Sequence, residues 1–228
     1  MEANAIQRDR PSGSWTRFSV LLATFALIGA VLLAGCGSDD QTEGLNGITR
    51  TPPTEVGNVQ LPNENPKTNN RIAQLKGGDD GLMLIYFGYT GCPDVCPTTL
   101  ADTRLALAEL SPEQQQQVEV GMVTVDPERD TARVLNGYLG HFFDRDAFAS
   151  FIPETAAQLS KAESVFGASH KLGEPDEDGA YDVDHTAQLF AVDSNGEVKV
   201  EWAFGTPADE MAADLKTLLN ETSPAQDA

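Results

Sequence analysis

A buried strand and the segment that follows it decide the fold. Residues 82–88 read Leu82-Met-Leu-Ile-Tyr-Phe-Gly88, an uninterrupted apolar run of strand length. Such a run predicts a central strand buried on both faces of a sheet. It continues into Tyr89-Thr-Gly-Cys92-Pro-Asp-Val-Cys96-Pro97, which puts two thiols at the carboxyl end of the strand, where α/β folds place ligands and reactive groups. Because Pro97 suits the first turn of a helix, we expect Cys96 to be the N-cap and Cys92 to lie in the preceding loop.

The rest of the chain predicts one alternating α/β domain. Apolar runs and turn signals predict strands near residues 56–62, 118–125, 148–152, 186–192 and 198–204, and helices near 97–110, 130–138, 154–166 and 206–220. Asp193-Ser-Asn-Gly196 is a turn signal, so the last two strands should form an antiparallel hairpin. This order predicts an α/β, thioredoxin-like fold with a central mixed β-sheet flanked by helices.

The N-terminal residues have the pattern of an export signal. Arg8, Arg10 and Arg17 precede an apolar run over residues 18–33, and Leu33-Ala-Gly-Cys36 is followed by polar residues. This predicts a lipoprotein signal peptide over residues 1–35, with lipid attached to Cys36. The alternative is an uncleaved transmembrane helix, because the run approaches the roughly 18–20 residues that span a bilayer. Either anchor puts the remaining chain on the extracytoplasmic face of the cell membrane.

Glycine and proline among polar residues predict a flexible linker over residues 36–55, which holds the domain off the membrane. The domain itself should span residues 56–220. Residues 221–228 are expected to form a disordered tail.

Composition excludes several classes of protein. The 228 residues include 15 Lys and Arg against 35 Asp and Glu, so the formal net charge of −20 argues against nucleic acid as a partner. Only three cysteines and three histidines are present, which excludes a multi-bridge disulfide scaffold and a zinc ribbon with two ligand pairs.

The pair Cys92 and Cys96 is expected to be redox-active, metal-binding or both; the alternative is an inert disulfide or two buried apolar fillers. His185 directly precedes a predicted strand whose start should lie beside the cysteine turn. Two thiolates and one imidazole suit Cu(I), and they accept Cu(II) when an oxygen donor or water is added. His141 and His170 are expected to be ordinary surface histidines.

Three separated segments resemble the Sco/SenC family of copper-delivery proteins for cytochrome c oxidase. They are Tyr86-Phe-Gly-Tyr-Thr-Gly-Cys-Pro-Asp-Val-Cys-Pro97, Val125-Asp-Pro-Glu-Arg-Asp-Thr131 and Val183-Asp-His-Thr186. The resemblance covers about residues 56–220 and implies that Cys92, Cys96 and His185 are copper ligands. Asp126 either supports a ligand from behind or belongs to a helix-capping turn. Gly91 departs from the family, which often has a larger residue there.

The resemblance implies a membrane-tethered copper chaperone that delivers copper to the binuclear copper site of an oxidase subunit and turns over little or no substrate. An extracytoplasmic thioredoxin-like reductase would be a second partner. The alternative is an enzyme, a thiol-disulfide oxidoreductase or peroxiredoxin-like reductase that uses Cys92 and Cys96 as nucleophile and resolving thiol. Against it, thioredoxin-type enzymes normally have a two-residue spacer and a proline where this chain has His185. A redox or copper sensor is a third possibility.

Overall fold

A six-stranded mixed sheet forms the centre of the domain in the computed structural model, which describes residues 44–67 and 71–222. The strand order is β1-β10-β9-β4-β5-β6. These strands are β1 (Thr54–Glu55), β4 (Leu82–Gly88), β5 (Val118–Thr124), β6 (Phe148–Phe151), β9 (Leu189–Val192) and β10 (Glu197–Trp202). β4, β5 and β6 are parallel, whereas β9 runs antiparallel to β4 and β10. The predicted α/β architecture with a mixed sheet is therefore confirmed.

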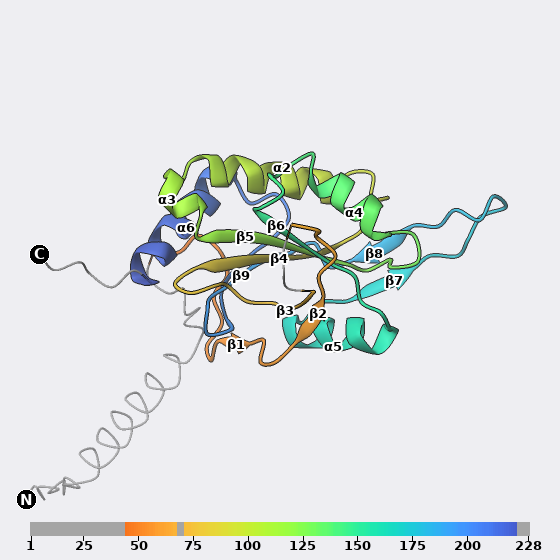
Figure 1. Ribbon diagram of the computed structural model, residues 1–228, viewed down its shortest axis with the longest axis horizontal. Coiled ribbons are helices and arrows are strands. Elements are labelled where there is room, and N and C mark those ends of the chain that lie inside the picture. The colour runs from red at the N-terminus through yellow and green to blue at the C-terminus, as the bar shows by residue number, and fades with distance from the viewer. Residues whose placement is uncertain (1–43, 68–70, 223–228) are drawn as a thin grey trace, which may run out of the picture. The chain divides into compact units, whose positions relative to one another are not determined.

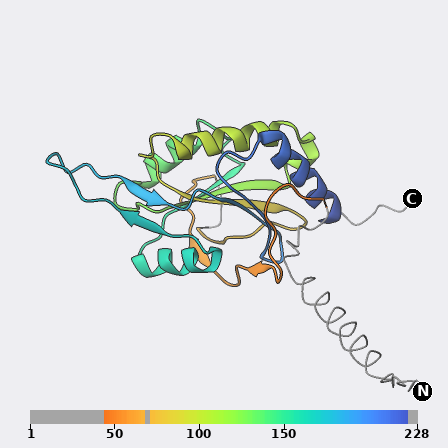
Figure 2. The same ribbon diagram turned by 180° about the vertical axis from the view of Figure 1, so that it is seen from behind.

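Helices cover both faces of this sheet. They are α2 (Val95–Ala108), α3 (Pro112–Gln115), α4 (Ala132–Leu139), α5 (Ala156–Phe166) and α6 (Ala208–Thr222). Figure 1 and the reverse view in Figure 2 show α2 and α6 against one face and α5 against the other. With both faces covered, all seven residues of β4 are buried, which explains why its sequence is apolar throughout rather than alternating.

Residues 44–55, which the sequence predicted to be part of a flexible linker, are instead part of the folded domain. Residues 44–55 lie along the edge strand: Ile48 exchanges two 2.8 Å backbone hydrogen bonds with Glu201, and β1 pairs with β10. A Cβ at Gly47 would come within 2.4 Å of Val200, so glycine permits this close approach. The segment binds mainly through its backbone and therefore has no side-chain periodicity, so the linker prediction is wrong for residues 44–55.

Two small antiparallel units were not predicted as such. β2 (Gln60–Pro62) pairs with β3 (Ile72–Gln74), and β7 (His170–Leu172) pairs with β8 (Val183–His185). Figure 1 shows the loop between β7 and β8 projecting from the body of the domain. The strand predicted over residues 186–192 begins only at Leu189, because the chain leaves β8 after His185 and then enters β9.

Helix boundaries also differ from their predictions. α2 begins at Val95, so Asp94 takes the N-cap position expected for Cys96. Pro97 is tolerated inside the first turn because an amide there has no partner within the helix. Thr131 caps α4 by accepting a hydrogen bond from the Val134 amide.

At the C-terminus, α6 runs to Thr222, two residues into the predicted tail. The remaining tail, the signal peptide over residues 1–35 and Cys36 lie outside the described residues. No helix among the described residues is long and apolar enough to cross a membrane.

Candidate metal centre

Two cysteines and one histidine meet at the carboxyl end of β4. Cys92 follows β4 in the loop, Cys96 lies in the first turn of α2, and His185 ends β8. One ligand atom from each lies within 4.8 Å of the other two, and Cys96 Sγ is 3.4 Å from His185 Nε2. Both thiols are free. The structure thus brings together the three residues that the sequence predicted to be ligands.

The start of α2 fixes the position of the two sulfurs. Asp94 at the N-cap makes no side-chain capping bond. Instead, the Cys96 amide, one of the donors that a helix start leaves without an internal partner, donates to Cys92 Sγ at 3.3 Å. The prediction of Cys96 as N-cap is wrong, because Cys96 lies inside the helix, but Cys92 lies in the preceding loop as expected.

His185 presents one defined nitrogen to the thiols. Its Nδ1 lies 3.0 Å from the Thr186 carbonyl oxygen, which can only accept, so Nδ1 carries the proton. In the neutral ring, Nε2 then has a lone pair that faces Cys96, which is the tautomer in which Nε2 can bind a metal. The rings of Tyr86 and Tyr89 pack edge-on against the imidazole, with centroids 6.0 and 5.7 Å away, and limit its movement.

Burial controls the charge of this site in the metal-free protein. Cys96 is fully buried, and this burial raises the pKa of its thiol to about 12. The start of a helix favours thiolates, but for Cys96 desolvation has the larger effect. Burial, followed by the nearby negative charge of a Cys96 thiolate, also raises the pKa of Tyr86, so its hydroxyl stays protonated. A metal ion bound by Cys96 must therefore displace a proton.

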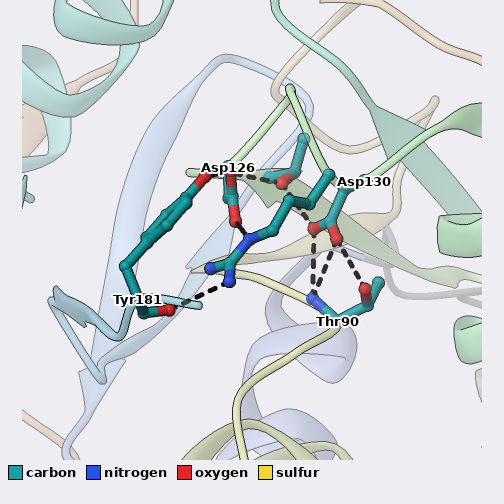
Figure 3. Close-up of polar contacts among 6 residues, drawn as sticks. Thr90, Asp126, Asp130 and Tyr181 are labelled. Atoms are coloured by element: carbon teal, nitrogen blue, oxygen red, sulfur yellow. Dashed lines mark hydrogen bonds and ion pairs between the residues drawn. The ribbon is translucent and has the colours of Figure 1, made fainter. Parts of the chain in front are cut away.

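The predicted supporting residue Asp126 lies outside this cluster. Its buried carboxylate pairs with Arg129 and accepts a 2.9 Å hydrogen bond from the Tyr181 hydroxyl (Figure 3). Asp126 does not cap α4, since Thr131 does.

Sequence reasoning missed the contacts that Asp130 makes with the cysteine loop. Asp130 is 1% exposed and accepts hydrogen bonds from Thr90 and Thr124. Desolvation raises its pKa despite these bonds. The sequence signal was an acidic residue six positions after the strand next to the cysteine strand.

The other two histidines lie outside the cluster. His141 is exposed, as expected. His170 is not an ordinary surface residue, because its Nδ1 is 2.5 Å from the buried carboxylate of Glu163.

Comparison with known proteins gives the family. The SCO1/SenC family model matches residues 64–220, well over half of the chain. The chain belongs to the SCO1/SenC family. A SCO2-like protein of Rickettsia felis is 30% identical over 160 residues, which are 70% of this chain and 75% of that protein.

Solved Sco structures share the fold. The apo Sco1 protein from Thermus thermophilus superposes with a TM-score of 0.63 at 31% identity, covering 76% of this chain and 96% of that one. ScoI of Bradyrhizobium japonicum, solved with copper bound, gives a TM-score of 0.58 at 31% identity and covers 70% of this chain and 96% of its own. The mixed sheet with flanking helices is the thioredoxin-like arrangement of Sco proteins, so the predicted fold class is confirmed.

Proposed function

We propose that this protein binds one copper ion through Cys92, Cys96 and His185 and delivers it to the binuclear copper site of cytochrome c oxidase. The observation that carries the proposal is the convergence of two sulfurs and one imidazole nitrogen within 4.8 Å in a member of the SCO1/SenC family. Thiolate sulfur and imidazole nitrogen are ligands that copper accepts in both oxidation states. Copper is here a cargo that the protein passes on.

The donor set of the described residues fits this cargo. Both sulfurs are available because they are free thiols. The site is compact, largely buried and flanked by Tyr86 and Tyr89, which protects soft ligands from water and oxidants. Membrane tethering, and delivery to the copper-receiving oxidase subunit, rest on the export signal and the family resemblance.

Anaerobic titration of the reduced protein with Cu(I), in competition with a chelator of known affinity, tests the proposal. We expect one tightly bound copper. Cys92→Ser or Cys96→Ser should lower the affinity by at least about a hundredfold, because a hard hydroxyl replaces a soft thiolate. His185→Ala should weaken binding less and should alter the Cu(II) spectrum.

Matched controls are available within the chain. Cys36→Ser removes the one cysteine that is not in the cluster, and His141→Ala removes an exposed histidine. Neither should change copper affinity. Unchanged affinity in all three ligand variants would refute the proposed site.

The second candidate function is thiol-disulfide exchange, and the close approach of the two free sulfurs supports it. Joining Cys92 and Cys96 in a disulfide removes two electrons and two protons, and a reductase dithiol would have to return them before copper could bind. Oxidised protein should therefore take up no copper at this site. Catalytic reduction of a disulfide substrate with weak copper binding would favour the oxidoreductase instead.

A further inference from the structure

The turn between β5 and α4 bonds to both chain segments that carry the candidate ligands. It contains Asp126 and Asp130, which are 2% and 1% exposed. Figure 3 shows Asp126 beside Tyr181 and Asp130 beside Thr90. We propose that this turn positions the two halves of the metal site mainly through different residues: Asp130 holds the cysteine loop, and Asp126 with Arg129 holds the strand of His185. This inference rests on the proposed copper function, because the positioning serves the copper site, whereas the contacts themselves are present without copper.

Asp130 attaches the cysteine loop to the end of β5. The amide and hydroxyl of Thr90 donate to its carboxylate at 3.0 and 2.5 Å, and the Thr124 hydroxyl donates to it at 2.6 Å. Thr90 stands two residues before Cys92, whose own amide donates to the Tyr89 carbonyl at 3.3 Å. A movement of Thr90 would therefore shift Cys92 relative to α2.

Asp126 and Arg129 hold the approach to β8 through Tyr181. Arg129 pairs with the Asp126 carboxylate and donates from Nη1 to the Tyr181 carbonyl at 2.9 Å. Its guanidinium carbon also lies 3.7 Å from the centroid of the Tyr181 ring, within the range of a cation–π contact. The same carbon lies 5.6 Å from the centroid of the Tyr89 ring, a more distant contact with the cysteine loop. The Tyr181 hydroxyl then returns a 2.9 Å hydrogen bond to Asp126. Tyr181 is thus held at its carbonyl, its ring and its hydroxyl, two residues before β8 begins.

β8 needs such an attachment because its own pairing is short. β7 and β8 form a separate sheet of two strands with three residues each, and an isolated two-stranded hairpin is at best marginally stable in water. The base of the hairpin is held by a 3.0 Å hydrogen bond from the Ser169 amide to the Thr186 hydroxyl. Arg129 supplies the attachment near the start of β8.

The two attachments should affect copper differently. Cu(I) is satisfied by the two thiolates, whereas Cu(II) depends more on the imidazole nitrogen. Weakening the histidine attachment should therefore impair Cu(II) binding selectively. Weakening the cysteine attachment should impair binding of both ions.

Hydrogen–deuterium exchange of the metal-free full-length protein tests the geometry without copper. Arg129→Gln should raise exchange mainly in residues 181–186, and Thr90→Val should raise it mainly in residues 89–96. Thr131→Ala is the matched control, because it removes the α4 cap in the same turn and touches neither attachment. If both variants change the same segments, or if Thr131→Ala reproduces either pattern, the positioning role is refuted.

Copper binding supplies the second readout. Arg129→Gln should weaken Cu(II) by at least about tenfold and shift its visible spectrum, while Cu(I) affinity changes by less than about threefold. Tyr181→Phe keeps the ring and carbonyl contacts and should give a smaller spectral shift. Thr90→Val should weaken both ions. Equal losses of affinity for Cu(I) and Cu(II) in Arg129→Gln would refute the assignment of Arg129 to the histidine half of the site. A wild-type protein that binds no copper would refute the proposed function, whereas the exchange pattern would still decide the positioning role.

Discussion

The protonation of Cys96 couples metal binding to pH. Burial raises the pKa of this thiol to about 12, so the metal-free protein carries a proton there at neutral pH. Copper must displace that proton, and we expect Cu(I) affinity to rise about tenfold per pH unit for each proton displaced. Chelator competition at several pH values between about 6 and 9 measures the slope, with the chelator's own protonation corrected. A flat profile would contradict a protonated Cys96.

The same shift sets the direction of a stability change in the metal-free protein. The pKa of Cys96 in the folded state lies above its ordinary value of 9.0, so the folded state holds this proton more tightly than the unfolded chain does. The contribution to stability is therefore complete below about pH 9 and is lost as the pH rises toward 12. Urea unfolding of wild type and Cys96→Ala across that range separates this effect from other titrations, because only the wild type should show it.

Gly88 is a residue whose lack of a side chain shapes the site. A Cβ at this position would lie 2.7 Å from Tyr86 Cε1 and 3.0 Å from Cys96 Sγ. Gly88→Ala should therefore displace Cys96, destabilise the fold by about 1–3 kcal/mol and weaken Cu(I) binding. Gly91→Ala is the control, since its Cβ would have its nearest contact with Tyr89 at 3.4 Å. Urea unfolding and copper competition on both variants measure the difference, and similar behaviour of the two would show that Gly88 is not sterically required.

At the scale of elements, the strands and helices that could be predicted are those whose burial leaves a local pattern of apolar residues in the sequence. The strand over residues 82–88 has the predicted bounds because both of its faces are buried, which leaves a continuous apolar run. The three ligand residues were found because cysteine and histidine are scarce in this chain. The composition of the site could therefore be predicted from the sequence, as two cysteines between a strand end and a helix start together with one histidine.

The elements that were missed depend on tertiary contacts. Residues 44–55 pair through their backbone with β10, and β7 and β8 have only three residues each, too few for a periodic signal. The role of Asp130 depends on Thr90, which is 40 positions away in the chain. No local pattern encodes such a contact.

Removing residues 44–55 tests whether they are part of the fold. The buried Asp214 carboxylate accepts bonds from the amides of Asn46 and Gly47 at 2.7 and 2.9 Å, and buried Glu201 pairs with Arg50. A chain that begins at Val56 leaves both carboxylates short of partners and should lose at least about 3 kcal/mol of unfolding free energy. A chain that begins at Gly44 is the control and should match the full mature protein in urea. Equal stability of the two shortened chains would restore the linker interpretation.

At the scale of the whole molecule, the charge of the chain and its predicted anchor would determine where the site can act. The formal net charge is −20, and such an acidic protein favours partners with a basic docking face near an anionic membrane surface. Confinement to the membrane would raise the local concentration of the site beside a membrane-bound oxidase without any added contact.

Anchoring through Cys36 is the prediction that this role requires. The pattern Leu33-Ala-Gly-Cys36 after one apolar run predicts cleavage before Cys36 and attachment of lipid to its thiol. Mass spectrometry of the membrane fraction should find a lipid-modified N-terminus at Cys36, and Cys36→Ser should abolish both the modification and the cleavage that depends on it. The copper site is separate, so Cys36→Ser should keep wild-type Cu(I) affinity. An intact Met1 in the membrane fraction would favour the uncleaved transmembrane helix, and a soluble cleaved product would refute both forms of anchoring.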